Sequence, residues 1–308
     1  MVNLTPKIIE NPFNYTGSKH RILPLILNNI PNVTKVVDVF GGSGEVGLSI
    51  GIPCLYNDLN KPLTCIIRTI QELSLGYMFD VINEYIAEFK LSKDNKSGFL
   101  DFRKQFNECR WFEYLNYSRN DILRWQSCLA LYTLMCYAFN YQLTFNKSGE
   151  YCVPSGYKRS SFNNNLRKKL TEYKYRLDEF GDNFQVTCKD FNLILDEYIS
   201  SNNDLSDVLF FIDPPYLISD DIYSRTNNLK WNEKKEKELY LKLLTIHKMD
   251  GKIMITNQLS KGDKENKLLK DFIIESGFDY LNTNVDFYNC SYQRKNKGND
   301  KEVIIKNY

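Results

Sequence analysis

The order of apolar and polar positions divides the chain into buried strands and amphipathic helices. Short runs rich in β-branched and other apolar residues lie at 33–40, 53–58, 207–213, 252–257 and 302–307. Apolar runs of this length, bounded by turn residues, predict strands that are buried on both faces of a parallel sheet.

Helical patterns alternate with these runs. A helix is predicted to start within GEVGLSI (44–50), directly after a glycine-rich turn. Residues 232–251 predict another, with Asn232 as its N-cap and Gly251 just past its end; Leu239, Leu243 and Ile246 keep helical spacing. Strands that alternate with helices predict a doubly wound α/β sheet.

The block between residues 63 and 183 differs, because it contains no convincing parallel-strand run. Apolar side chains keep helical spacing around 99–109, 123–134 and 166–177. Within residues 139–159, the sequence NKSGE predicts a hairpin turn between short aromatic strands. We therefore expect a discontinuous α/β catalytic domain, residues 1–62 and 184–308, interrupted at 63–183 by a mostly helical insertion that carries a β-hairpin.

Composition is that of an ordinary globular protein, with 43% hydrophobic and 25% charged residues among 308. No apolar run is long enough to span a bilayer and the N-terminus lacks a signal-peptide pattern, so we expect a cytoplasmic protein without membrane contact. None of the eight cysteines forms a C-x-x-C pair and there are two histidines. This composition disfavours a metal site and Ser-His-Asp chemistry.

The net charge of +2 is unevenly distributed. Residues 140–175 contain seven lysines and arginines and two glutamates, a local charge of +5. A basic segment on a slightly acidic body is typical of a site for a polyanion. A solvated helix face would explain the same charges.

The sequence DVFGGSGEVG (38–47) matches G-x-G-x-x-G between a predicted strand and helix, and Asp58 ends the next strand. Glycines allow a ligand to approach the backbone closely, and an acidic residue at the second strand can bind ribose hydroxyls. The pattern suits either a dinucleotide or S-adenosylmethionine. A tight turn without a ligand would also satisfy it.

A second short motif, FNYTGSK (13–19), precedes the first strand, where a dinucleotide-binding unit has no use for it. Lys19 could pair with the carboxylate of S-adenosylmethionine, and Tyr15 or Phe40 could contact its sulfonium by cation–π attraction. Gly17 would allow the loop to bend. A basic loop without a ligand is the alternative.

The third motif is FIDPPYLI (211–218), in which a buried strand ends on Asp213. Pro214 and Pro215 lack backbone N–H groups and stiffen the exit, so the segment presents acceptors only, beside the ring of Tyr216. Such a site suits an exocyclic amine on an aromatic base. A stiffened strand exit and a proline-rich ligand motif are the alternatives.

DPPY together with FGGSG and YTGSK resembles the Dam-type, D12-class DNA adenine-N6 methyltransferases of bacteria and phages, over nearly the whole chain. The resemblance implies a Rossmann-like sheet that binds S-adenosylmethionine and methylates a flipped-out adenine in duplex DNA. It assigns the target adenine to Asp213, Pro214 and Tyr216. It assigns the cofactor to Tyr15, Lys19, Phe40, Gly41, Gly42, Gly44, Asp58 and Asp213.

The resemblance also implies a DNA interface on the insertion. The basic side chains of Lys158, Arg167, Lys168 and Lys169 would contact phosphates. Asn140, Pro154 and Arg159 match positions that contact DNA, but Thr144 stands where GATC-specific relatives have a guanine-reading arginine. Threonine cannot make that bidentate contact, so we expect a site other than GATC. A cognate restriction endonuclease is a conceivable partner.

Three other functions compete with this interpretation. The same chemistry could act on RNA or on a protein amide. A nucleotide-dependent oxidoreductase would use the glycine turn but leave YTGSK and DPPY unexplained. A non-catalytic DNA-binding protein would be expected to lose one of the motifs.

Overall fold

The structure is a computed structural model, which describes residues 3–13, 17–109, 113, 121–218, 231–283 and 300–308. Tyr15, a predicted cofactor contact, lies outside the described residues.

An eight-stranded sheet forms the centre of the molecule, in the order β3-β2-β1-β4-β5-β8-β7, with β6 paired to β5. The strands are β1 (Lys35–Asp38), β2 (Cys54–Asn57), β3 (Phe184–Thr187), β4 (Val208–Ile212), β5 (Lys252–Lys261), β6 (Lys264–Glu265), β7 (Asp279–Asn282) and β8 (Lys301–Lys306). β1 to β5 pair in parallel, whereas β6 and β8 run antiparallel to β5, and β7 antiparallel to β8. The five predicted strands and the doubly wound α/β class are confirmed, but the strand predicted at 302–307 is antiparallel to its neighbours rather than part of the parallel sheet. β3, β6 and β7 were not predicted.

The helices are α1 (Leu23–Leu27), α2 (Glu45–Ile50), α3 (Lys61–Glu72), α4 (Leu75–Glu88), α5 (Lys96–Glu108), α7 (Asp121–Tyr137), α8 (Asn164–Phe180), α9 (Phe191–Ser201), α10 (Glu233–Lys248) and α11 (Lys267–Ser276), with short 3₁₀ turns η1 (Phe139–Tyr141) and η2 (Gly181–Asn183). The predicted helix at 232–251 is confirmed as α10. Its N-cap Asn232 accepts a hydrogen bond from the Lys235 N–H at 3.0 Å. No described helix is long and apolar enough to cross a membrane.

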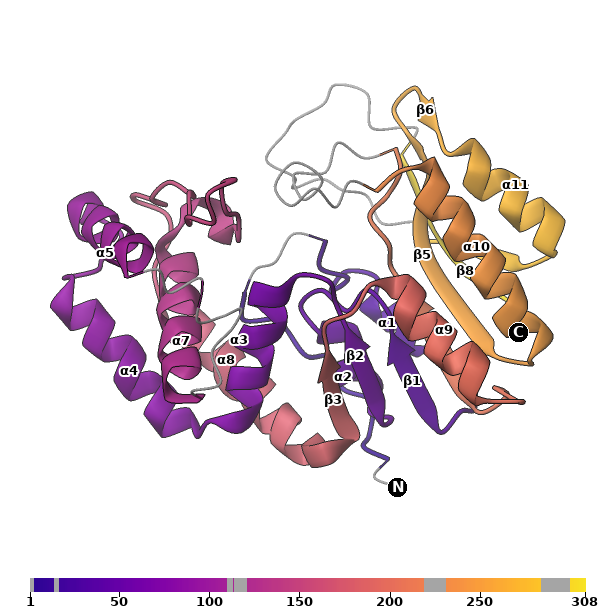
Figure 1. Ribbon diagram of the computed structural model, residues 1–308, viewed down its shortest axis with the longest axis horizontal. Helices are drawn as coiled ribbons and strands as arrows, with labels where there is room; N and C mark the ends of the chain where they lie inside the picture. Colours follow the sequence, from indigo (N-terminus) through magenta and orange to yellow (C-terminus); the bar gives the residue numbers. More distant parts are fainter. Residues whose placement is uncertain (1–2, 14–16, 110–112, 114–120, 219–230, 284–299) are drawn as a thin grey trace.

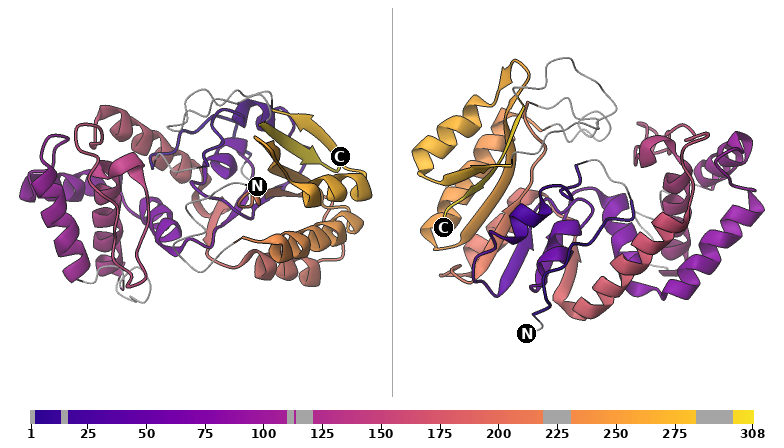
Figure 2. Two further views of the ribbon diagram at one scale, coloured as in Figure 1. Left: turned by 90° about the horizontal axis from the view of Figure 1, so that it is seen from above. Right: turned by 180° about the vertical axis from the view of Figure 1, so that it is seen from behind.

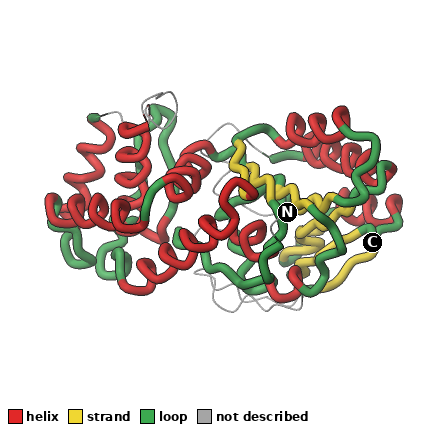
Figure 3. The backbone as a smooth tube through the Cα atoms, turned by 90° about the horizontal axis from the view of Figure 1, so that it is seen from below, coloured by secondary structure: helices red, strands yellow, loops and turns green. Residues whose placement is uncertain are grey.

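Alternating side chains of the strands enter two separate cores. On β4, Phe210 and Ile212 join the core under α9, α10 and α11, whereas Leu209 and Phe211 face the core that contains α1, α2 and α3. Successive side chains of a strand point to opposite faces, so the uninterrupted apolar run at 207–213 covers both. Figure 3 shows helices on both sides of the strands.

The segment 63–183 forms a helical part to one side of the sheet, beyond β3 (Figure 1). The three helical patterns predicted there are found in α5, α7 and α8. The predicted hairpin has a turn at 146–150 that is closed by an isolated bridge between Phe145 and Tyr151, and a second bridge joins Ala138 to Ser155 further out. The two arms do not form regular strands.

Helix α8 joins this helical part to the sheet, as the view from behind shows (Figure 2, right). Tyr173 donates its hydroxyl to the Ser43 carbonyl at 2.8 Å. Buried Arg176 donates to the carbonyl oxygens of Leu48 and Thr5, both at 2.9 Å. One apolar core also extends from β1 and β4 through α3 and α7 to α8. The two predicted domains, divided at 62/63 and 183/184, therefore share an apolar core. The division remains a proposal that the two parts have different functions.

Replacing Arg176 with alanine should destabilise the fold by about 2–4 kcal/mol, because two backbone carbonyls lose a charged donor, and such bonds contribute roughly 1.5–3 kcal/mol each. Urea unfolding measures the change. Glu179, the half-exposed ion-pair partner of Arg176, provides the control: Glu179→Ala should change stability by less than about 1 kcal/mol. Equal stability of Arg176→Ala and the wild type would contradict the role of α8.

Candidate active site

The three sequence motifs meet where the strand order reverses. β1 lies between β2 and β4, and Asp38 of β1 is in register with Phe211 of β4. The glycine turn that leaves β1 and the Asp213 segment that leaves β4 therefore come from adjacent strand ends. This is the position at which open α/β sheets bind ligands.

Hydrogen bonds from β2 and α8 hold the glycine turn: Tyr56 of β2 donates to Gly42, and Tyr173 of α8 donates to Ser43. Tyr56 donates its hydroxyl to the Gly42 carbonyl at 2.7 Å, and a Cβ on Gly41 would lie only 2.2 Å from the Tyr56 ring. Gly44 has φ +73° and caps α2. Side chains at these positions would clash or strain the backbone, so the glycines are required by packing as well as by any ligand.

Asp58 follows β2 and faces the same turn. Its Oδ2 accepts the Gly42 N–H at 2.8 Å and its Oδ1 accepts the Asn60 N–H at 2.7 Å. Burial raises the pKa of Asp58 above its ordinary value, although both backbone donors lower it. A carboxylate has about four acceptor positions, so two remain for ligand hydroxyls.

Asp213 is engaged at both oxygens. Its Oδ2 forms an ion pair with Lys19 Nζ at 2.8 Å, and its Oδ1 accepts the Thr256 hydroxyl at 2.6 Å. Burial alone would lower the pKa of Lys19, but the nearby carboxylates, Asp213 first, raise it above its ordinary value. The ammonium group therefore stays charged, and the N-terminal motif is brought directly to the DPPY motif.

Tyr216 completes the corner. The Lys19 ammonium lies 5.3 Å from the centroid of its ring, and its hydroxyl donates to Glu302 Oε1 at 2.7 Å. Burial, with the charges of Asp213 and Glu302, keeps the pKa of Tyr216 well above its ordinary value. The Tyr216 side chain is therefore a neutral phenol, and its hydroxyl donates a hydrogen bond to Glu302.

Glu45, the first residue of α2, holds the N-terminal motif in place. Its buried carboxylate accepts the Asn11 amide at 2.8 Å and the Ser18 hydroxyl at 2.8 Å, and also the backbone N–H of Lys19. No sequence motif marks Glu45 as a site residue, because an acidic side chain in the first turn of a helix is common for electrostatic reasons alone.

Phe40 lies in a cluster of aromatic rings at the same edge of the sheet. Its ring centroid is 5.6 Å from those of Phe191 and Trp231. Phe191 is the first residue of α9, which follows β3, and Trp231 precedes Asn232, the N-cap of α10. Three chain segments thus place an apolar wall beside the glycine turn.

Asp38, the last residue of β1, is buried beneath the turn, and among the described residues neither of its carboxyl oxygens has a hydrogen-bond partner with ordinary distance and angle. Burial, together with the charges of Asp213 and Asp58, raises the pKa of Asp38 well above its ordinary value. This carboxyl group therefore favours its protonated form in the folded protein.

The hairpin residues predicted to contact DNA lie together. The Phe139 N–H donates to the Pro154 carbonyl at 2.8 Å, which places exposed Asn140 beside exposed Pro154. The guanidinium of Arg159 lies 5.8 Å from the Phe139 ring centroid. Arg103 and Asn107 of α5 hold the hairpin backbone through Val153 and Tyr151.

The other predicted DNA contacts are more scattered. Lys158 is exposed on the same loop as Arg159. Thr144 lies along the hairpin opposite Cys152, and the Cys152 N–H donates to the Thr144 carbonyl at 3.3 Å. Lys168 is exposed on α8, whereas the neighbouring Lys169 is partly buried and forms an ion pair with Glu10 at 2.8 Å. Arg167 instead packs on the Phe162 ring, 4.5 Å from its centroid, and donates to Asn83 at 2.5 Å. Arg167 is therefore partly committed to packing.

Comparison with known proteins identifies the group to which this site belongs. The D12 class N6 adenine-specific DNA methyltransferase family matches residues 15–295. The chain belongs to this family. The match includes the glycine turn, the hairpin and the DPPY segment, so the resemblance inferred from the motifs is confirmed.

Named relatives of this D12-class chain include DNA modification enzymes. It is 31% identical over 308 residues to Type II methyltransferase M.FokI of Planomicrobium okeanokoites and 30% identical over 311 residues to Modification methylase StsI of Streptococcus sanguinis. These alignments cover 99% and 100% of this chain but 44% of each relative, so the chain spans less than half their length. A DNA N-6-adenine-methyltransferase of Escherichia phage P1 is 24% identical over 249 residues, which cover 80% of this chain and 29% of the relative.

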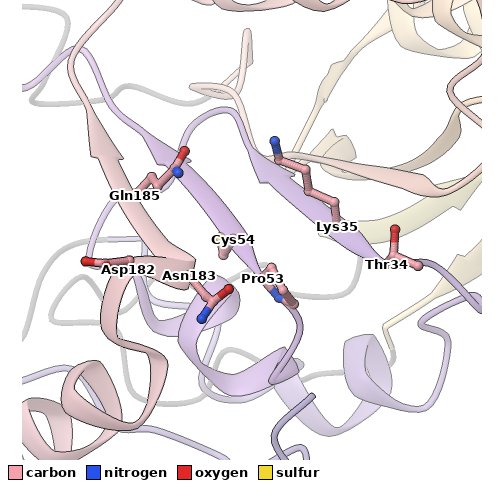
Figure 4. Close-up of a pocket in the computed structure, with 7 residues that line it drawn as sticks. All are labelled: Thr34, Lys35, Pro53, Cys54, Asp182, Asn183 and Gln185. Atoms are coloured by element: carbon pink, nitrogen blue, oxygen red, sulfur yellow. The ribbon is translucent and has the colours of Figure 1, made fainter. Parts of the chain in front are cut away.

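A hollow of about 510 Å³ borders this site, because Leu217 and Ile218 of the FIDPPYLI motif line it together with Glu233 and residues 264–268. A cavity of about 230 Å³ is lined by Lys35, Cys54 and Gln185, at the starts of β1 to β3 and thus at the opposite end of the strands (Figure 4). Among the described residues, no group of three or more His, Cys, Asp or Glu side chains could hold a metal ion.

Replacing Glu45 with glutamine should loosen the N-terminal motif, because one carboxylate oxygen that accepts hydrogen bonds becomes an amide donor. We expect the amide hydrogens of Phe13 and Lys19 to exchange about tenfold faster or more, since a bond to a charged group contributes roughly 1.5–3 kcal/mol. Residue-resolved hydrogen exchange measures this. Glu10 pairs with Lys169 at 2.8 Å in the same segment, and Glu10→Gln should leave both amides unchanged. Unchanged exchange in Glu45→Gln would show that the motif is held by other contacts.

Proposed function

We propose that this chain transfers the methyl group of S-adenosylmethionine to N6 of an adenine rotated out of duplex DNA. The observation that carries the proposal is the adjacency of Asp213, at the end of β4, to the glycine turn at the end of β1. An acceptor-only corner beside a cofactor loop is suited to aiming an amine. Family membership supports the same reaction.

The residues around the turn fit S-adenosylmethionine. Asp58 keeps free acceptor positions for ribose hydroxyls, and Gly41, Gly42 and Gly44 allow close approach of a ligand to the backbone. Phe40 supplies an apolar wall. Lys19 is a charged, nearly buried cation that could bind the carboxylate of the methionine moiety. The bound cofactor supplies the methyl group; Tyr15 remains a proposed contact at its methionine end.

Asp213 and Pro214 orient the substrate amine. An adenine N6 is a poor nucleophile because its lone pair is delocalised into the ring. Hydrogen bonds from N6–H to an Asp213 oxygen and to the Pro214 carbonyl favour a geometry in which the lone pair points at the methyl donor. Pro214 and Pro215 have no N–H with which to compete for these acceptors. Such positioning can raise effective concentration to the order of 10⁵–10⁸ M.

Tyr216 stacks on the target base in this proposal. Rotating a base out of a duplex costs a few kcal/mol, and stacking on an aromatic ring can return roughly 1–3 kcal/mol. Lys19 now lies over the Tyr216 ring and on Asp213. We therefore expect its ammonium to move towards the cofactor carboxylate when both ligands are bound.

The hairpin and its surroundings are the proposed DNA interface. Asn140, Pro154 and Arg159 lie together and exposed, in reach of base edges, while Lys158 and Lys168 are exposed for phosphate contact. Arg167 is a weaker candidate because it packs against Phe162. Because the proposed substrate is DNA and the named relatives come from bacteria and a phage, we place the protein in the cytoplasm of a bacterial cell or phage-infected host. The proposed companion is a cognate restriction endonuclease.

Replacing Asp213 with alanine should lower methyl transfer by about 10²–10³-fold or more, the range for removal of one group that acts on the transition state. The assay is transfer of tritiated methyl to DNA, followed by nucleoside analysis for N6-methyladenine. Duplex DNA should compete and structured RNA should not. Asp207 precedes the other end of β4 and is exposed; Asp207→Ala should retain wild-type activity. Near-normal transfer by Asp213→Ala would remove the assigned role.

Thr144 predicts a recognition sequence other than GATC, because its hydroxyl cannot form the two parallel hydrogen bonds by which arginine reads guanine. Long-read modification mapping of DNA from an expressing host lacking its own adenine methylases gives the sequence. We expect N6-methyladenine in one recurring sequence context that is not GATC. Consistent modification of GATC would show that Thr144 does not occupy the guanine-reading position.

A further inference from the structure

The Tyr216 ring is held at its far end by a residue outside all three motifs. Glu302 lies 86 residues further along the chain, on β8, and its Oε1 accepts the Tyr216 hydroxyl at 2.7 Å. Glu302 is only 8% exposed. Burial raises the pKa of Glu302, and the nearby Lys19 charge and the Tyr216 hydroxyl offset part of that rise.

Two neighbouring strands hold the two parts of the DPPY corner. β8 runs antiparallel to β5, with Glu302 opposite Gln258 and Ile304 opposite Thr256. Thr256 of β5 donates to Asp213, and Glu302 of β8 receives the hydroxyl of Tyr216. The Asp213 carboxylate and the Tyr216 ring are therefore both held by side chains of β5 and β8, which are paired with each other.

Ring orientation matters for the proposed reaction. A tyrosine ring is oriented by two side-chain torsions. A hydrogen bond at the hydroxyl fixes the first torsion because it anchors the oxygen, and it limits the second because the O–H bond prefers to lie in the plane of the ring. A bond to an ionised acceptor is about twice as strong as one between neutral groups. If the ring stacks on the extruded adenine, its tilt determines where N6 lies relative to Asp213.

We propose that Glu302 is a positioning residue for methyl transfer, which fixes the Tyr216 ring so that the stacked base presents N6 to Asp213. This inference rests on the proposed function and deepens it. Glu302 does not contact the reacting atoms; it acts through the hydroxyl of Tyr216. A merely structural Glu302 would affect folding stability but not the stacking of the base.

Four variants test this: Glu302→Ala, Glu302→Gln, Tyr216→Phe and the double variant Glu302→Ala/Tyr216→Phe. Single-turnover methylation should fall about 10- to 100-fold in Glu302→Ala and in Tyr216→Phe, the range for loss of a hydrogen bond to a charged group. The double variant should be no slower than the slower single variant, because both changes remove one interaction. Glu302→Gln should be faster than Glu302→Ala, since its amide oxygen still accepts the hydroxyl.

A spectroscopic readout separates positioning from stability. 2-Aminopurine placed at the mapped target fluoresces when it leaves the duplex stack and is quenched when it stacks on an aromatic ring. Saturating Glu302→Ala should give brighter fluorescence than saturating wild type. Tyr308 donates its hydroxyl to the Asn29 carbonyl at 2.9 Å, away from the DPPY corner. Tyr308→Phe is therefore the matched control and should match the wild type in rate and fluorescence.

The outcomes distinguish this inference from the function on which it rests. A wild-type chain that methylates no DNA would overturn both. An active wild type with equally active Glu302→Ala, or with losses from Glu302→Ala and Tyr216→Phe that multiply in the double variant, would overturn only the role of Glu302. If Glu302→Ala does not fold, Tyr216→Phe with full activity and unchanged fluorescence would overturn it equally.

Discussion

The site depends on how negative charge is compensated at the end of a buried parallel sheet. Asp38, Asp58, Asp213 and Glu302 all lie near one strand edge, and burial raises the pKa of three of them, Asp38, Asp58 and Glu302. One nearly buried ammonium, Lys19, faces this group and pairs with Asp213. An unpaired buried charge would cost several kcal/mol. Asp213 is paired with Lys19 and Thr256, and Asp58 accepts two backbone N–H groups, whereas the raised pKa of Asp38 favours its protonated form. A site of this kind attracts a cation or an amine donor.

Much of the fold could be predicted because its signals are local. The runs that form β1, β2, β4, β5 and β8 are strongly apolar, and their alternating side chains enter two cores. β3 and β7 were missed because they lie towards the two edges of the sheet and each contains exposed polar residues. The sequence NKSGE predicted the hairpin turn. The arms of the hairpin are held by Arg103 and Asn107 of α5, a contact between distant segments that the sequence does not reveal.

The residues of the candidate site also fall into those that a local sequence motif marks and those that only the folded chain brings together. Asp213, Lys19, Asp58 and the glycines belong to contiguous motifs, so the sequence pointed to them, and the structure brings these described residues to one edge. Glu45, Thr256 and Glu302 act through contacts between distant segments. Nothing in KEVIIK marks Glu302 as different from an ordinary strand glutamate; only the register of β8 against β5 brings it to Tyr216. Arg167 shows the converse, since its charge suggested a phosphate contact and packing on Phe162 uses part of its guanidinium face.

The most direct test of the central claim is a crystal structure of the protein with S-adenosylhomocysteine and a duplex that contains the mapped sequence. We expect the extruded adenine to stack on Tyr216, with N6 about 2.7–3.2 Å from an Asp213 oxygen and from the Pro214 carbonyl. The sulfur of the cofactor product should lie in line with N6, beside the glycine turn. An adenine bound elsewhere, or an Asp213 that still pairs with Lys19 and makes no contact with the base, would contradict the assignment.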